Sequence, residues 1–278
     1  MRRRSVASAI AAAVLAAALV AACAGSSSAG QLRHRAATVD YRPGVRADVF
    51  LPAKTHRAPL VVLVPGGGWT SADATGLRPL ADRLADAGIA AVTASYRTAH
   101  DHVRFPVPAA DVECAVDFAV ARVRRAGVEP APVILLGHSA GAHLALLVAL
   151  TGALFHAGCP YPIARVDGAI GLAGPYDIMS LQPVAQALFD RSAAEEPEAW
   201  RIANPVTWVG LRRELRVLLV HGADDTTVSP TFTTSFADRL RATGHAVQVE
   251  LVPHADHASV YRAGVVGDRL VRWIRAWP

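Results

Sequence analysis

The sequence is organised around one stretch, Val133-Ile134-Leu135-Leu136-Gly137-His138-Ser139-Ala140-Gly141-Ala142-His143-Leu144-Ala145-Leu146. A short apolar run leads into a Gly-x-Ser-x-Gly turn, and an Ala-rich apolar run follows it. The first run predicts a buried strand and the second a buried helix. Ser139 then lies in a strained turn, where the two glycines let strand and helix pack closely. This context favours a nucleophilic serine over an ordinary Gly/Ser turn.

Strands and helices are expected to alternate along the rest of the chain. Apolar runs bounded by turn residues predict strands over 45–51, 59–64, 89–95, 133–136, 166–172, 215–220 and 247–252. Helices are predicted over 77–84, 107–125, 139–150, 230–242 and 260–273. This alternation indicates an α/β fold, with a mostly parallel central sheet and helices on both faces. Reactive groups in such a sheet gather at the carboxyl ends of the strands.

A glycine-rich loop follows the strand predicted over 59–64. Gly66, Gly67 and Gly68 have no side chains, so their main-chain N–H groups can approach a carbonyl oxygen closely. Gly67 and Gly68, together with the N–H of Ala140, are the predicted oxyanion hole. The alternative is a simple glycine turn.

Two later loops carry a candidate acid and a candidate base for Ser139. Asp224 and Asp225 follow the strand predicted over 215–220, and either carboxylate can orient an imidazole. His254 and His257 follow the last predicted strand. The chain order serine, aspartate, histidine is the order expected of an α/β-hydrolase.

With these pieces in place, the chain resembles the α/β-hydrolases that include hormone-sensitive-lipase-like carboxylesterases, BD-type feruloyl esterases and kynurenine formamidase-like enzymes. The resemblance implies Asp225 rather than Asp224, through the frame His221-Gly222-x-x-Asp225-x-x-Val228, and His257 rather than His254. One residue departs from the family pattern, because Pro65 stands where the family usually has a histidine before the glycines. The matching segments are Gly66-Gly67-Gly68-Trp69, Ser95-Tyr96-Arg97, Phe105-Pro106 with Asp111, Gly137-His138-Ser139-Ala140-Gly141, Gly174-Pro175-Tyr176-Asp177, Asn204-Pro205 and His257.

The resemblance implies a serine hydrolase that cleaves small to medium carboxylic esters through an acyl-enzyme, with the triad Ser139, Asp225 and His257. No cofactor and no metal site are expected. A formamidase or other amide hydrolase is the alternative enzyme, because the same triad serves activated amides. A non-catalytic binding protein of the same fold is the alternative outside enzymes.

Two features of the catalytic domain remain open at this level. The segment over 176–203 is expected to form a small cap above Ser139, and its apolar residues could line a pocket or pack the cap onto the body. Cys114 and Cys159 could form a disulfide or stay as separate buried thiols.

The N-terminal segment reads as an export signal. Residues 1–22 begin with Met1 and three arginines and continue as an apolar, Ala-rich run, as a signal peptide does. The run ends in Leu19-Val20-Ala21-Ala22-Cys23, which resembles a bacterial lipobox with Cys23 as the lipidated residue. Residues 23–38 are then a flexible tether and 39–278 the catalytic domain. A cell-envelope lipoprotein is therefore expected, with an ordinary cleaved signal and secretion as the alternative.

Charge gives no indication of a nucleic-acid partner. The formal net charge is +5, but without Arg2, Arg3 and Arg4 it is +2, with 25 basic residues against 23 acidic ones. The remaining basic residues are scattered and form no run interleaved with aromatics. A small ester is the expected partner, with the membrane reached only through the lipid anchor. The sequence does not indicate an oligomeric state.

Overall fold

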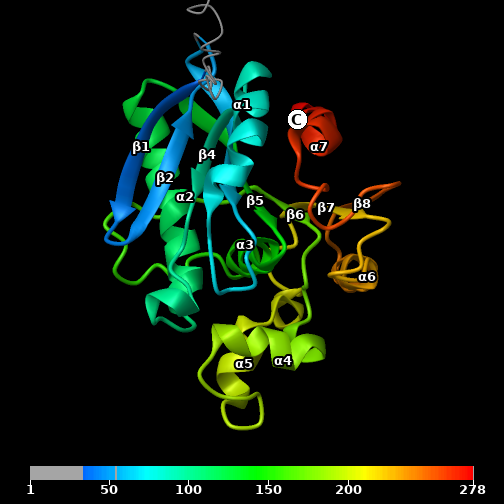
Figure 1. Ribbon diagram of the computed structural model, residues 1–278. Helices are drawn as coiled ribbons and strands as arrows, with labels where there is room; N and C mark the ends of the chain where they lie inside the picture. The colour runs from blue at the N-terminus through cyan, green and yellow to red at the C-terminus, as the bar shows by residue number, and fades with distance from the viewer. Residues whose placement is uncertain (1–33, 54, 278) are drawn as a thin grey trace, which may run out of the picture. The chain divides into compact units, whose positions relative to one another are not determined.

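An eight-stranded sheet forms the centre of the protein in a computed structural model that describes residues 34–53 and 55–277 (Figure 1). The strand order is β1-β2-β4-β3-β5-β6-β7-β8. β1 pairs antiparallel with β2 and β2 antiparallel with β4, whereas the other neighbours are parallel. The strands are β1 (Arg35–Arg42), β2 (Val45–Phe50), β3 (Arg57–Val64), β4 (Ala90–Ala94), β5 (Glu129–His138), β6 (Gly168–Leu172), β7 (Arg216–Gly222) and β8 (Val247–Val252).

The sheet confirms the predicted α/β-hydrolase fold and adds one strand to it. All seven predicted strands are present, as β2 to β8. β1 was not predicted, and it begins at Arg35, inside the range 23–38 assigned to the tether. Residues 35–38 of that range therefore belong to the sheet and not to a linker. β1 is an edge strand, and among its residues whose burial is described Tyr41 alone is buried, so it lacks the apolar run that identifies a central strand.

Helices cover both faces of the sheet (Figure 1). Alternation along β3 sends Val61 and Leu63 to one face and Val62 and Val64 to the other. The first face packs against α1 (Arg78–Asp86) and α7 (Ala263–Arg275). The second packs against α2 (Val107–Arg125), α3 (Ala140–Thr151) and α6 (Thr231–Ala242). These five helices correspond to the five predicted ones.

A helical insertion between β6 and β7 occupies the segment predicted as a cap. Figure 1 shows α4 and α5 together, apart from the sheet and close to α3. The insertion leaves the sheet after β6, at the edge where the parallel strands end. Its elements are η3 (Ile178–Leu181), α4 (Gln182–Ala185), η4 (Gln186–Leu188), α5 (Pro197–Ala203) and η5 (Pro205–Trp208).

A disulfide joins Cys114, on α2, to Cys159, in the loop between α3 and β6. The sequence had left this pairing open. The predicted signal peptide and Cys23 lie outside the described residues. Within residues 34–53 and 55–277, no helix combines the length and apolarity needed to span a bilayer.

Candidate active site

Ser139 occupies a strained turn between β5 and α3. Its φ of 52° and ψ of −123° are unusual for a residue with a side chain. A Cβ at Gly137 would clash with the Gly141 carbonyl, and a Cβ at Gly141 would clash with the carbonyls of Val64 and Pro65. Both glycines are therefore required for the close approach of strand and helix. The turn holds the Ser139 hydroxyl at the sheet edge, as the sequence predicts.

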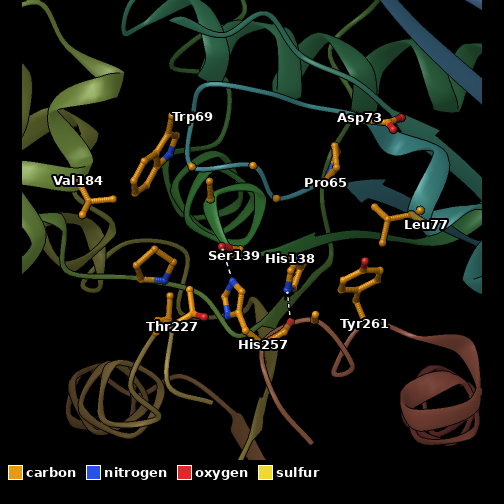
Figure 2. A pocket seen from close by; sticks show the side chains of 18 of the residues that line it. Pro65, Trp69, Asp73, Leu77, His138, Ser139, Val184, Thr227, His257 and Tyr261 are labelled. Carbon is orange, nitrogen blue, oxygen red and sulfur yellow. Dashed lines mark hydrogen bonds between the residues drawn. The ribbon is translucent and has the colours of Figure 1, made fainter.

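Three predicted residues meet at this edge, although they come from three separate loops, and Figure 2 shows two of them, Ser139 and His257. His257 Nε2 lies 2.9 Å from Ser139 Oγ, and His257 Nδ1 lies 2.7 Å from Asp225 Oδ2. Asp225 follows β7, and His257 follows β8. The rival residues lie away from this group. The side chains of Asp224 and His254 are 64% and 96% exposed, and they face each other at 3.9 Å.

The Asp225 carboxylate is buried and fully surrounded by donors. Oδ1 accepts the N–H groups of Thr227 and Val228, both at 2.9 Å. Oδ2 faces His257 and lies 3.2 Å from Nε2 of His221. Burial raises the pKa of Asp225, but the Val228 N–H and His257 outweigh burial and hold that pKa below its usual value. An ionised Asp225 orients His257 with Nδ1–H toward the carboxylate and leaves Nε2 free to accept the serine proton.

Two buried histidines support the triad, and sequence reasoning gave neither a role. His221 donates from Nε2 to the Val228 carbonyl at 2.9 Å, which fixes the turn that holds Asp225. His138 donates from Nε2 to the carbonyl of His257, also at 2.9 Å, and its ring packs on Tyr261. Burial lowers the pKa of His138 to about 4, and the neighbouring His257 adds to the shift. His138 therefore stays neutral and acts as a fixed donor.

The predicted oxyanion loop lies beside Ser139. Gly67 and Gly68 have φ values of 136° and 59°, and a Cβ on Gly67 would clash with Ser71. In the described part of the chain, the N–H groups of Gly67, Gly68 and Ala140 have no backbone acceptor. Ala140 is the first residue of α3, where an N–H has no partner within the helix. A Cβ added at Gly66, the residue after Pro65, would lie 2.9 Å from the side chains of His138 and Ser139, so the loop runs directly against the nucleophile turn.

A pocket of about 500 Å³ opens over Ser139 and extends to both sides of it (Figure 2). Trp69 and Val184 lie on one side of the serine, and Pro65, Leu77 and Tyr261 lie on the other. Most of the lining is apolar, which suits the hydrocarbon parts of a small ligand.

The cap contributes only part of its apolar surface to this pocket. Leu181 and Val184 line it, and Val184 is 59% exposed. Leu188, Phe189 and Trp200 are buried, and Phe189 and Trp200 stack with their ring centroids 4.4 Å apart. The cap therefore uses its aromatic residues for packing and two aliphatic residues for the pocket wall.

One group of side chains has the spacing of metal ligands but not the chemistry. Asp117, His156 and Cys159 approach one another closely. The sulfur of Cys159 is bonded to Cys114, so it offers no thiolate to an ion. His156 Nδ1 instead bonds the Asp117 carboxylate at 2.9 Å.

Comparison with known proteins assigns the family. The BD-FAE family model matches residues 47–240, from β2 into α6. The chain belongs to the BD-FAE family. The match includes Ser139, the glycine loop and Asp225, and ends before His257. The family and the strand order agree with the α/β-hydrolase fold that the sequence indicates.

Two curated relatives of this BD-FAE chain come from Mycobacterium tuberculosis. Esterase LipC is 32% identical over 237 residues, which cover 77% of this chain and 58% of LipC. The probable carboxylic ester hydrolase LipM is 30% identical over 218 residues, covering 73% of this chain and 50% of LipM. The chain thus spans about half to three fifths of the length of these relatives.

Solved structures share the fold of this BD-FAE chain at low sequence identity. A truncated carbohydrate esterase from gut microbiota has a TM-score of 0.74 and 16% identity, covering 87% of this chain and 96% of its own. A thermophilic esterase of Thermogutta terrifontis has a TM-score of 0.70 and 20% identity, covering 88% and 91%. These likenesses establish the fold.

Proposed function

We propose that this protein is a serine carboxylesterase that hydrolyses small to medium esters through an acyl-enzyme. The observation that carries the proposal is the continuous hydrogen-bonded series from Ser139 Oγ through His257 to the buried Asp225 carboxylate. The esterase names of the BD-FAE relatives support the same reaction class.

The geometry supports a two-step reaction. Ser139 Oγ attacks the ester carbonyl carbon while its proton passes to Nε2 of His257. The N–H groups of Gly67, Gly68 and Ala140 stabilise the negative oxygen that forms. The bond from carbon to the alcohol oxygen then breaks, and His257 returns the proton to the departing alcohol. Water, deprotonated by the same imidazole, releases the carboxylic acid and restores Ser139.

The pocket sets the expected size of the substrate. A cavity of about 500 Å³ lies in the range of small-molecule sites and accommodates short chains on either side of the scissile bond. Its walls carry mostly apolar side chains, so binding is expected to come from hydrocarbon contact, at roughly 0.8 kcal/mol per buried methylene.

The test is hydrolysis of p-nitrophenyl esters from acetate to laurate, with Ser139→Ala as the control. We expect the highest kcat/KM among the short and medium esters and a loss of about 10⁴-fold or more in Ser139→Ala. An organophosphonate should label Ser139 in the wild type. Turnover of aryl formamides without turnover of any ester would identify an amide hydrolase instead. Unchanged ester turnover in Ser139→Ala would refute the nucleophile.

We also propose that the protein is an exported lipoprotein of a bacterial cell envelope, anchored through Cys23. The lipobox-like run before Cys23 supports the anchor. The Cys114–Cys159 disulfide supports export, because disulfides persist in oxidising compartments.

Mass spectrometry of the mature N-terminus tests the anchor. We expect Cys23 to carry a diacylglyceryl thioether and an N-acyl chain, and the protein to partition into detergent. Cys23→Ser should abolish that partition while ester turnover stays unchanged. Two acyl chains or more are sufficient for stable anchoring. An unacylated N-terminus beyond Cys23 would indicate ordinary secretion and would leave the esterase proposal intact.

A further inference from the structure

His143 is a fully buried histidine that the reaction described above does not use. It lies on α3, one turn after Ser139, and is 0% exposed. Trp69 donates its Nε1–H to Nδ1 of His143 at 3.2 Å, and Nε2 of His143 lies 2.9 Å from the carbonyl oxygen of Ala203. An indole only donates and a carbonyl only accepts, so the ring must be neutral with its proton on Nε2.

These two hydrogen bonds connect three parts of the active site that are distant in the sequence. Trp69 directly follows Gly67 and Gly68 and lines the pocket. Ala203 is the last residue of α5, at the end of the cap. The next residue, Asn204, accepts the N–H of Ile178 at 3.4 Å and donates to Asp177 at 3.1 Å, so it ties the end of the cap to its beginning. His143 therefore lies between the oxyanion loop and the base of the cap.

The backbone of Trp69 needs such a support. Its φ of 59° is in the left-handed region, which is sterically unfavourable for a bulky residue. The indole is 2% exposed and meets the imidazole edge-on, with ring centroids 5.3 Å apart and planes at 88°. A side chain held by both ring contact and hydrogen bond keeps its backbone in this conformation, and the adjacent Gly67 and Gly68 N–H groups stay in place with it.

We propose that His143 is a positioning residue for the oxyanion hole, acting through Trp69, and that it couples this loop to the cap through Ala203. The proposal rests on the proposed esterase function. Burial lowers the pKa of His143 to about 4, while the Ala203 carbonyl opposes the shift. The imidazole therefore remains an acceptor for Trp69 throughout the neutral range.

Two substitutions of His143 form a matched pair. Glutamine can accept from Trp69 with Oε1 and donate to Ala203 with Nε2, whereas leucine can do neither. We expect His143→Leu to lower kcat for p-nitrophenyl butyrate by about 10- to 100-fold, because misplaced donors lose part of the 10²- to 10³-fold effect of one oxyanion donor. The KM should change less than kcat, and His143→Gln should recover most of the loss.

A merely structural role for His143 would give a different result. It would reduce the fraction of active protein, which titration of Ser139 with an organophosphonate counts. We therefore compare two quantities between wild type and variants. The first is kcat per titrated site, and the second is the rate with p-nitrophenyl butyrate divided by the rate with its thionoester. N–H donors stabilise an oxygen anion better than a sulfur anion, so this ratio should fall in His143→Leu and recover in His143→Gln. Wild-type values of both quantities in His143→Leu would overturn the proposal.

Trp69→Phe tests the same contact from the other side and serves if His143→Leu does not fold. Phenylalanine keeps an aromatic ring in the site but removes the N–H donor. We expect Trp69→Phe to lower both kcat per titrated site and the ratio of ester to thionoester rates, as His143→Leu does. In a variant that carries both His143→Leu and Trp69→Phe, the losses should be less than additive. Unchanged values would count against the inference. Absence of ester turnover in the wild type would instead refute the proposed function itself.

Discussion

The two carboxylate oxygens of Asp225 have different roles. Oδ1 closes the turn after β7 by accepting two main-chain N–H groups, and Oδ2 orients His257. Its neighbour Asp224 has a side chain that is 64% exposed and lies 3.9 Å from Nδ1 of His254. Adjacent residues of the same type therefore differ in environment, because only one of them faces the buried side of the turn.

Single substitutions of the two aspartates and the two histidines should distinguish the catalytic pair from its neighbours. Asp225→Asn should lower kcat by about 10⁴-fold, because an amide facing Nδ1 favours the wrong imidazole tautomer. His257→Ala should be at least as severe, whereas Asp224→Asn and His254→Ala should stay close to wild type. Steady-state kinetics on p-nitrophenyl butyrate measures all four. A large loss in His254→Ala would show that the loop after β8 has a different register in solution.

The cap illustrates how an element divides its side chains between packing and substrate contact. Phe189 and Trp200 pack inside it, whereas Val184 lies in the pocket wall on the Trp69 side of Ser139. A change at Val184 should therefore alter pocket size without disturbing the cap core.

Val184→Trp is expected to narrow the pocket and to change the chain-length preference. We expect the ratio of kcat/KM between the longest and shortest accepted esters to fall by about fivefold or more, since each lost methylene contact is worth roughly 0.8 kcal/mol. Alkyl esters that vary only in the alcohol show whether the affected side holds the acyl or the alcohol part. Leu154→Trp is the control, because Leu154 is exposed beyond the far end of α3. Unchanged profiles in both series would exclude Val184 from the substrate site.

The loop between α3 and β6 is fastened to α2 by covalent and polar contacts together. Beside the Cys114–Cys159 disulfide, Glu113 accepts the N–H of Phe155 at 2.7 Å and Asp117 accepts the N–H of Ala164 at 2.7 Å. These carboxylates satisfy main-chain donors that would otherwise be buried without partners. These contacts hold the loop to α2 at several points along its length.

Removing the disulfide should lower stability with little effect on catalysis. The double variant Cys114→Ala, Cys159→Ala should lose about 2–4 kcal/mol in the free energy of unfolding, because the bridge closes a long loop in the unfolded chain. Urea denaturation followed by circular dichroism measures this change. The kcat should remain within about twofold, since Ser139 belongs to the other end of α3. Equal urea midpoints for oxidised wild type and the variant would contradict the expected stabilisation.

At the scale of the whole molecule, buried titratable groups give the free energy of unfolding opposite dependences on pH. Burial lowers the pKa of both His138 and His143 to about 4, below the unfolded value, so these residues reduce stability as pH falls from about 6.5 toward 4. Burial raises the pKa of Glu113 to about 7, above its unfolded value. The stability contributed by protonated Glu113 is therefore full at low pH and is lost as pH rises toward 7.

Glu113→Gln should remove the pH-dependent contribution of Glu113 to the free energy of unfolding. Glutamine can still accept the Phe155 N–H but has no charge to desolvate. We expect equal stability of variant and wild type near pH 4, and an advantage of about 1–2 kcal/mol for the variant near pH 8, after discounting for solvent screening. Glu198→Gln, at an exposed pair with Arg201, is the control and should show no comparable pH-dependent gain. An advantage that is the same at both pH values would rule out ionisation as the cause.

Local patterns in the sequence determined the fold and the main catalytic candidates. Apolar runs bounded by turns predict seven of the eight strands, and the Gly-x-Ser-x-Gly turn predicts the conformation of Ser139. Strands that run in parallel bring their carboxyl ends to one edge, so Ser139, the glycine loop and the two later loops had to meet there. The family frame then selected Asp225 and His257. These features are predictable because each depends on residues close in sequence or on the direction of a strand.

Only the tertiary structure decided the contacts that join distant segments. The disulfide spans 45 residues, the His138 bond to the His257 carbonyl spans 119, and the bond from Trp69 to His143 spans 74. Edge strand β1, with little apolar surface, is defined by pairing with β2. The tertiary structure likewise decided which apolar residues of the cap pack inside it and which line the pocket, because only burial distinguishes the two groups. Such contacts leave no periodic pattern in the chain, because they depend on where the sheet and its helices place side chains in space.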